Sequence, residues 1–274
     1  MSFTVIIPAR FDSSRLPGKP LMKINGMTMI ERVYAQSMKS HADRVIVATD
    51  SKKIFDEVIH FGGQAYMTSS HHQSGTDRLQ EVAKQLDLPP KHIVVNVQGD
   101  EPLIPPEAIN QVASNLAARD SVGVATLFEP IDNLEDFIDK NVVKVVVDNA
   151  GLALLFSRAP VPWPREDMDN KVDELSVTDL PMRHIGIYAY RISMLNQFVS
   201  WSIAPIERKE LLEQLRFIWY GEKIHVAKAA VEVPKGVDTK EDLEDVIKFL
   251  TTNSLSQLNN TYDEYYEPSQ FSGS

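Results

Sequence analysis

Cysteine is absent from this chain of 274 residues, which excludes disulfide bridges, thiolate nucleophiles and thiolate metal sites. Any metal ion that the protein binds must therefore be held by oxygen or imidazole ligands. The lack of cysteine also fits a reducing compartment, and we expect a cytoplasmic protein.

Long apolar runs are absent too, since no stretch of roughly eighteen apolar residues occurs. The N-terminus also lacks a basic segment followed by an apolar one and a small-residue cleavage site. We therefore expect neither export nor membrane insertion. Hydrophobic residues still make up 43% of the chain, which is enough for the core of one large α/β domain or of a domain with a sizeable insertion.

Positive charge is also scarce. The 28 Lys and Arg residues stand against 38 Asp and Glu residues, and the formal net charge is −10. Nucleic-acid-binding proteins neutralise many phosphates with a basic face, so we expect no nucleic-acid partner. A small anionic substrate stays possible, because the local charge of a cleft matters more than the sum.

The two common phosphate-binding motifs are missing as well. Gly18-Lys19 is followed by Pro20, so it is not part of a Walker loop, and no G-x-G-x-x-G sequence follows a strand. If the protein binds phosphate, it must hold it in another way.

The stretch from residue 3 to residue 19 offers such a way. Its apolar run ends at Pro8 and is typical of a strand buried on both faces of a parallel sheet. Ligands of such sheets bind beyond the carboxyl ends of the strands, where this chain carries Arg10 and Lys19. Guanidinium and ammonium groups pair strongly with phosphate, so we predict a polyphosphate site, the alternative being a solvated surface loop.

Strands and helices alternate at short spacing through the first half of the chain, which predicts an α/β fold with a mostly parallel central sheet and flanking helices. We expect strands at 44–49, 64–68 and 92–97. We expect one helix that begins after Thr28, a second that ends at Phe61 and a third over 74–86. Later elements are less regular. We expect strands at 122–128, 142–147, 152–156, 184–191 and 223–229, and helices at 105–119, 133–140, 205–220 and 239–250.

Residues 1–250 are therefore expected to form a single domain, in which about 130–200 form an insertion with a small mixed sheet. Asn149, Ala150 and Gly151 form a turn that predicts an antiparallel hairpin there. Residues 251–274 have few aliphatic side chains and are predicted to be a flexible tail.

Two acidic loops are candidates for a divalent cation. Asp100 and Glu101 follow the strand at 92–97, and Mg²⁺ prefers one or two carboxylates together with phosphates and waters. Asp238 lies in a tight turn before the last helix and would complete the site with Asp100. The alternative for each of these acids is ordinary helix capping.

Other candidates are polar residues at the ends of predicted elements. Ser74 and Gly75 begin a helix with small residues that let a ligand approach backbone N–H groups, and Arg78 adds charge one turn later; ordinary capping is the alternative. Arg158, at the end of a strand, is a cation that an acidic sugar would need. We expect His41, His71 and His72 to be surface residues rather than metal ligands.

Taken together, the motifs closely resemble the 3-deoxy-manno-octulosonate (Kdo) cytidylyltransferase family, the CMP-Kdo synthetases of Gram-negative bacteria. The resemblance runs from residue 2 to about 250 and excludes only the tail. The motifs that carry it are IPARFDSSRLPGKPL, VATDS, HQSGTDRLQEV, VNVQGDEPLIP, ALLFSRAPVPW, RHIGIYAYR, LLEQLRFIWYGEKIHV and GVDTKEDLE.

The resemblance implies a GT-A-like nucleotidyltransferase fold, a homodimer formed through the insertion, dependence on Mg²⁺, and synthesis of CMP-Kdo from CTP and Kdo for lipopolysaccharide assembly. It assigns catalysis to Arg10, Lys19 and Asp100 and the metal to Asp100 and Asp238. The nucleotide residues that it implies are Ala9, Arg10, Lys19, Ser74, Gly75, Arg78 and Gln98. The sugar-acid residues that it implies are Gln98, Arg158, His184, Tyr188 and Gln214.

One local departure from the family is the segment from Ala159 to Pro162, where the family often has a threonine and fewer prolines. The stiffer backbone leaves another acid sugar, such as 8-amino-Kdo or a sialic acid, as an alternative substrate. A glycosyltransferase on the same fold and a nucleotide-binding regulatory module without turnover are further alternatives, because fold alone does not decide function.

Overall fold

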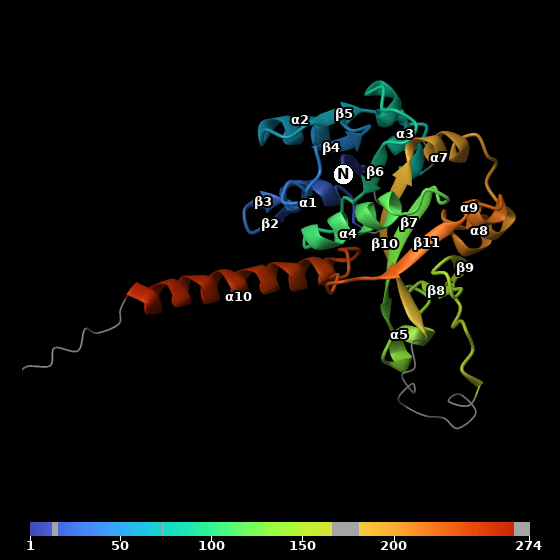
Figure 1. The fold of residues 1–274 in the computed structure, drawn as a ribbon. Helices are drawn as coiled ribbons and strands as arrows, with labels where there is room; N and C mark the ends of the chain where they lie inside the picture. The colour runs from blue at the N-terminus through green and yellow to red at the C-terminus, as the bar shows by residue number, and fades with distance from the viewer. Residues whose placement is uncertain (13–15, 73, 166–180, 266–274) are drawn as a thin grey trace, which may run out of the picture.

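The structure is a computed structural model that describes residues 1–12, 16–72, 74–165 and 181–265, with side chains up to residue 252. A nine-stranded sheet runs through the molecule, with helices on both of its faces (Figure 1). Along the sheet the strands follow the order β11-β7-β10-β6-β1-β4-β5, and β8 and β9 join it through β10. The predicted fold class is confirmed.

The strands of the sheet are β1 (Phe3–Ala9), β4 (Arg44–Thr49), β5 (Ala65–Met67), β6 (Ile93–Asn96), β7 (Val124–Pro130), β8 (Lys144–Val147), β9 (Ala153–Ser157), β10 (Met182–Arg191) and β11 (Ile224–Lys228). Strands β5, β4, β1 and β6 are parallel neighbours, and β11 is parallel to β7. Strand β10 runs antiparallel to both β6 and β7. A separate two-stranded sheet consists of β2 (Lys23–Ile24) and β3 (Met27–Thr28).

Two hydrophobic clusters cover the two faces of the sheet, because side chains alternate along each strand. In β1, Val5 and Ile7 point into one cluster and Ile6 into the other. The first cluster is covered by α1 (Met29–Ser37), α2 (Lys52–His60) and α4 (Pro106–Ala117). The second cluster is covered by α3 (Gly75–Gln85), α7 (Ile192–Phe198) and α9 (Leu215–Trp219).

Strand β10 contains an irregularity that matters for the site. Ile185 pairs with Leu127 and Tyr188 with Thr126, so three steps along β10 match one step along β7. The bulge thus inserts two residues. Because two is an even number, the alternation of faces continues across it, and Tyr188 shares a cluster with Tyr190.

Several helix ends agree with the local sequence. Thr28 caps α1 and Ser74 caps α3, each through a reciprocal capping box. At α2, Ser51 occupies the N-cap position but makes no side-chain cap bond, and the neighbouring Asp50 binds Arg78.

The C-terminal part of the chain differs from the prediction at two places. The helix expected over 205–220 is broken into α8 (Pro205–Glu210) and α9, because Leu211 has φ of 54°. The last helix, α10 (Lys240–Tyr265), does not end at Leu250 as expected; its first turns pack on Ile24 of β2 and Met29 of α1, and its remainder extends away from the body (Figure 1). Flexibility of the predicted tail stays a prediction, since residues 266–274 lie outside the described part of the chain.

The region expected to be an insertion has one further difference. Its hairpin, β8 and β9, is antiparallel as predicted, but it joins the central sheet through a bridge between Arg183 and Lys144. The small α5 (Leu134–Ile138) packs beside it. Residues 166–180 of this region lie outside the described part of the chain.

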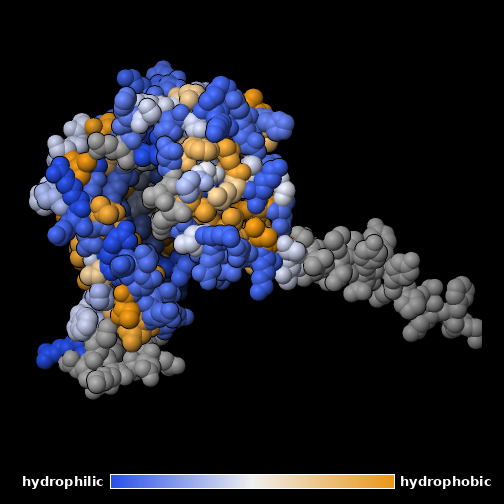
Figure 2. Space-filling model, turned by 180° about the vertical axis from the view of Figure 1, so that it is seen from behind, coloured by the Kyte–Doolittle hydropathy of each residue, from blue (hydrophilic) through white to orange (hydrophobic). Residues whose placement is uncertain are grey.

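The exposed surface is mainly hydrophilic on the face shown in Figure 2, with apolar side chains in separate groups. None of the described helices combines the length and the apolar composition that a bilayer crossing requires.

We predict that L211G stabilises the protein. Leu211 adopts a left-handed conformation that glycine tolerates without a steric penalty, and its side chain is 78% exposed and contributes little packing. The free energy of unfolding in urea should rise by up to about 1 kcal/mol. V199G is the control, because Val199 ends α7 with φ of −69°; it should destabilise, and an equal gain in both variants would contradict the explanation.

Candidate active site

The site lies at the carboxyl ends of β1 and β6, which are hydrogen-bonded neighbours. The loop after β6 passes close to the end of β1: a Cβ atom on Gly99 would lie 2.9 Å from the Pro8 carbonyl oxygen. Only glycine fits such an approach. A cavity of about 340 Å³ opens here, and both Arg10 and Asp100 line it.

Lys19 is the centre of this site. Gly18, with φ of 71°, turns the chain into a short 3-10 helix (Lys19–Leu21) and directs the lysine inward. Its Nζ donates to Asp100 Oδ2 at 2.6 Å, to the Val237 carbonyl oxygen at 2.8 Å and to Asp238 Oδ1 at 3.3 Å. The Lys19 side chain is 11% exposed, whereas that of Asp238 is 47% exposed. The carboxylates of the cluster are therefore more exposed than the ammonium group. Three predicted residues that are far apart in sequence thus converge.

The donor set is suitable for Mg²⁺. Within the described residues, no group of three or more His, Asp or Glu side chains has the spacing of a complete metal cage. Asp100 and Asp238 provide two carboxylates, which is the number that Mg²⁺ usually takes from a protein when phosphates and waters supply the rest. The residues present therefore fit a magnesium ion that arrives with a phosphate ligand.

Residues predicted to hold the nucleotide surround the same strand ends. Ala9 ends β1, and Arg10 donates from Nη2 to the His72 carbonyl oxygen at 2.8 Å, which fixes its guanidinium beside the cavity. Gly75, at the start of α3, lies against Pro8, and the Ser74 hydroxyl accepts the Asp77 N–H.

Arg78 is placed differently from the other predicted cations. Its side chain is fully buried and forms an ion pair with Asp50 at 2.7 Å and a hydrogen bond to the Thr68 hydroxyl. The side chain links α3 to the ends of β4 and β5. A role for Arg78 at the nucleotide stays a prediction. Its guanidinium is bound to Asp50 and Thr68, so the contribution that the structure supports is to hold α3 against the ends of β4 and β5.

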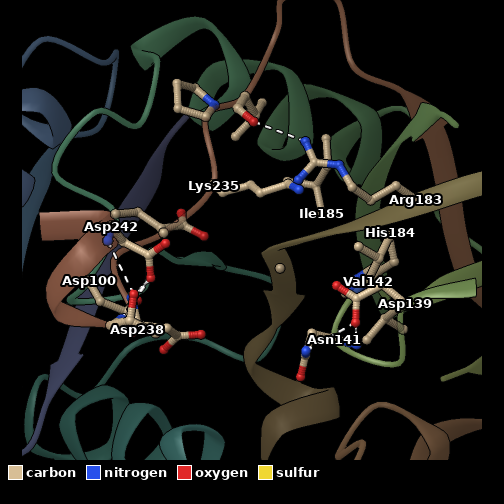
Figure 3. Close-up of a pocket in the computed structure, with 17 residues that line it drawn as sticks. Asp100, Asp139, Asn141, Val142, Arg183, His184, Ile185, Lys235, Asp238 and Asp242 are labelled. Carbon is tan, nitrogen blue, oxygen red and sulfur yellow. Dashed lines mark hydrogen bonds between the residues drawn. The ribbon is translucent and has the colours of Figure 1, made fainter. Parts of the chain in front are cut away.

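A second cavity of about 540 Å³ lies on the other side of Asp100 and Asp238 (Figure 3). Its wall includes His184, whose ring packs edge-on against Phe156 and contacts the ring of Tyr188. Thr126 has one hydroxyl hydrogen, which goes to a main-chain carbonyl, so His184 Nε2 is the donor in its 3.2 Å bond to Thr126 Oγ1. Burial, aided by the Arg183 charge, lowers the pKa of His184 to about 3.

Of the five predicted sugar residues, His184 is the one that lines this cavity within the described part of the chain. The Tyr188 hydroxyl is buried and has no hydrogen-bond partner among the described residues. Gln98 Nε2 is 3.5 Å from the Gly186 carbonyl oxygen, and Gln214 begins α9. Arg158 donates from Nε to the Glu210 carbonyl oxygen at 2.8 Å, so its head is held at the end of α8.

Two acids have buried carboxyl groups here: Glu101, which the sequence analysis named only as the neighbour of Asp100, and Glu213, which it missed. Burial and the Asp100 charge raise the pKa of Glu101 to about 8, and its Oε2 atom has no partner among the described residues. Burial also raises the pKa of Glu213, whose Oε2 accepts from Thr76 Oγ1 at 2.7 Å. The adjacency of Glu101 to Asp100 was the only sequence signal for either, because burial is set by elements distant in the chain.

Arginine and lysine side chains beside paired carboxylates, at the strand ends of a mostly parallel sheet, suit the charge stabilisation that a nucleotidyltransferase requires. The sequence model of the family described as Cytidylyltransferase matches residues 4–224, which gives the class. The chain is 56% identical over 246 residues to 3-deoxy-manno-octulosonate cytidylyltransferase of Sodalis glossinidius (strain morsitans), covering 90% of this chain and 97% of that one. It is 54% identical to that of Vibrio cholerae serotype O1 (strain M66-2), covering 89% and 96%. The chain belongs to the family of 3-deoxy-manno-octulosonate cytidylyltransferases.

Solved structures agree with this assignment. The structure of CMP:2-keto-3-deoxy-manno-octonic acid synthetase complexed with CTP aligns with a TM-score of 0.82 at 36% identity, over 92% of this chain and 99% of that chain. A cytidylyltransferase from Leptospira borgpetersenii serovar Hardjo-bovis (strain JB197) aligns with a TM-score of 0.53 at 16% identity, over 92% and 94%. The second likeness supports the fold alone.

We predict that His184 makes the protein sensitive to acid. The unfolded chain takes up this proton near pH 6.5 and the folded protein only near pH 3, so the contribution to stability is complete above pH 6.5 and is lost as the pH falls below it. Between about pH 7.5 and 5.5, wild type should lose about 1 kcal/mol more than H184Q in the free energy of unfolding.

Urea unfolding of the metal-free protein at both pH values measures this difference. H60Q, which removes an exposed imidazole at the end of α2, is the control and should follow wild type. An H184Q variant with the full acid sensitivity of wild type would show that another group is responsible.

Proposed function

We propose that the protein transfers the cytidylyl group of CTP to Kdo and releases CMP-Kdo and pyrophosphate. The observation that carries the proposal is the convergence of Lys19, Asp100 and Asp238 beside a cavity at the strand ends. Curated relatives 53–56% identical to the chain carry the name of this activity, and the neighbouring solved structure holds CTP.

The nucleotide lies in the cavity beside β1 in this proposal. Arg10 and Lys19 bind the phosphates, while Ala9, Gln98 and the start of α3 at Ser74 and Gly75 contact the nucleotide. Asp100 and Asp238 would hold Mg²⁺, which when bound offsets the negative charge that grows on the phosphates. Lys19 exchanges a carboxylate for a phosphate oxygen without moving far, because its ammonium already lies between both acids.

The sugar acid occupies the side of the site formed by His184, Tyr188 and Gln214. The neutral His184 and the Tyr188 hydroxyl suit sugar hydroxyl groups, and Arg158 supplies the charge for the carboxylate. The anomeric hydroxyl oxygen attacks the α-phosphorus and its proton passes to the solvent, while the bond from that phosphorus to the bridging oxygen breaks and pyrophosphate leaves with the electron pair. Alignment and charge stabilisation are the protein's main contributions, and no covalent nucleophile is needed.

We further propose that the product serves lipopolysaccharide assembly and that the protein acts in the cytoplasm, which the use of CTP as the donor supports. We also propose a homodimer formed through the region that contains β8, β9 and α5. That region exposes three large apolar side chains, which are Ile138 at 55%, Leu154 at 57% and Trp163 at 58% exposure. Exposed apolar groups of this size mark association surfaces when they cluster.

We predict that D100N and D100A lower kcat by about 100-fold or more at saturating Mg²⁺, because a ligand of the charge-stabilising centre is lost. Cooperative unfolding should persist, since Lys19 keeps Asp238 and Val237 as partners. Pyrophosphate release from CTP, coupled to a colour reaction, measures the rate. D56N, which removes an exposed carboxylate on α2, should retain full activity.

The same assay identifies the substrate when Kdo, 8-amino-Kdo and a sialic acid are compared. The proposal requires the highest kcat/KM with Kdo. A higher kcat/KM with another acid would change only the identity of the acceptor sugar. If no acid gave pyrophosphate, cytidylyl transfer would be refuted and a glycosyltransferase favoured. A D100A variant with most of its kcat would refute the metal assignment.

We predict that L154D shifts the oligomeric state toward monomer in size-exclusion chromatography with light scattering. A charge in an apolar interface is costly to bury. I59D is the control, because Ile59 is an apolar residue of α2 that is 51% exposed and lies outside the proposed interface. A dimer that survives L154D would exclude this face.

A further inference from the structure

The loop that carries Asp238 lacks secondary structure of its own. It follows β11, whose ladder with β7 ends where the Ala229 N–H donates to the Phe128 carbonyl oxygen at 2.8 Å. The next ladder bond of a parallel pair would need the N–H of residue 130. That residue is Pro130, which has none, so the loop leaves the sheet.

Beyond the end of the ladder, the backbone of the loop is bound by two side chains instead of by a neighbouring strand. Glu129 Oε1 accepts the Val233 N–H at 2.7 Å. Arg183 Nη2 donates to the Val233 carbonyl oxygen at 3.0 Å, the bond drawn as a dashed line from Arg183 in Figure 3. Glu129 and Arg183 face each other across β7 and β10 and form an ion pair through Arg183 Nη2 and Glu129 Oε2. We name this arrangement the Glu129–Arg183 clamp.

The clamp is well enclosed. Its side chains are 16% and 19% exposed, and the residue that it holds, Val233, is 2% exposed within the first hydrophobic cluster. Charged hydrogen bonds in such surroundings are stronger than exposed ones, and losing one partner leaves the other unpaired. The clamp is therefore a firm attachment of the loop.

A second attachment lies four residues further along. The Val237 N–H donates to the Asp100 carbonyl oxygen at 2.8 Å, and its carbonyl oxygen accepts from Lys19. Between the two attachments the loop has no other backbone hydrogen bond to the sheet among the described residues. The position of Asp238 relative to Asp100 thus depends on both.

We propose that Glu129 and Arg183 are positioning residues that set the place of Asp238 and so the affinity of the site for its divalent cation. The inference rests on the proposed function only for the identity of the site as the phosphate and metal centre. Neither residue needs to contact substrate. Arg183 also lines the larger cavity, so a direct contact with the sugar acid is the outcome that the test must separate.

The first experiment needs no turnover. In E129A and R183M, amide hydrogen exchange of the metal-free protein should become faster across 229–238, whereas the other edges of the sheet stay protected. Mn²⁺ binding in the presence of CTP, followed by electron paramagnetic resonance, should weaken about ten-fold, as is usual when groups that orient a metal ligand are removed. Where either variant fails to fold, E129Q and R183K replace it.

The second experiment uses kinetics. The Mg²⁺ concentration for half-maximal rate should rise about ten-fold, while kcat at saturating Mg²⁺ and the KM for the sugar acid change much less. R191M is the matched control, since Arg191 lies at the other end of β10 and binds the carbonyl oxygens of Val122 and Leu116. It should leave the Mg²⁺ dependence unchanged.

A double-variant cycle shows whether Glu129 acts through Asp238. Adding E129A to D238N should weaken Mn²⁺ binding by less than two-fold beyond D238N alone, because the ligand that it positions is already lost. Unchanged exchange at 229–238, additive losses in the cycle, an equal effect of R191M, or a rise confined to the KM for the sugar acid would each overturn the proposal. If cytidylyl transfer itself is refuted, the exchange and Mn²⁺ results still decide the role of the clamp.

Discussion

The site depends on one buried cation held among acids. The Lys19 ammonium binds Asp100, Asp238 and the Val237 carbonyl oxygen, and so connects the first loop of the chain to the loop after β6 and to the start of α10. Two carboxylates so close together repel each other, and the ammonium relieves that repulsion. The lysine thereby preorganises the acids before any nucleotide or metal arrives, which reduces the reorganisation that binding requires.

Beside this centre, burial favours the neutral forms of two titratable groups. Arg10 and Lys19 line the smaller cavity, whereas at the larger cavity burial keeps His184 neutral and raises the pKa of Glu101 to about 8. A neutral imidazole and a protonated carboxyl can both donate hydrogen bonds without adding net charge. The arrangement suits a reaction that joins an anionic nucleotide to an anionic sugar, since each anion meets its own cation.

The sequence predicted the sheet and the meeting of Lys19 with Asp100 because those depend on local patterns. Apolar runs that end in polar loops identified the strands, and the carboxyl ends of parallel strands must meet at one edge, which is why Lys19 and Asp100 converge. The break at Leu211 was not predictable, because leucine favours helix and only tertiary packing holds its φ at 54°. Likewise, the Glu129–Arg183 clamp depends on strand register and on a loop about 50 and 100 residues away, which no local pattern encodes.

The bulge in β10 has a consequence for variation in this strand. Its two inserted residues leave Arg183 facing the metal loop and both His184 and Tyr188 facing the aromatic cluster. A deletion of one residue between Ile185 and Tyr188 would turn the strand over on one side of the bulge, sending the Arg183 guanidinium among the rings and the His184 imidazole toward the acids. Only a change of length by two residues would keep both side chains on their present faces.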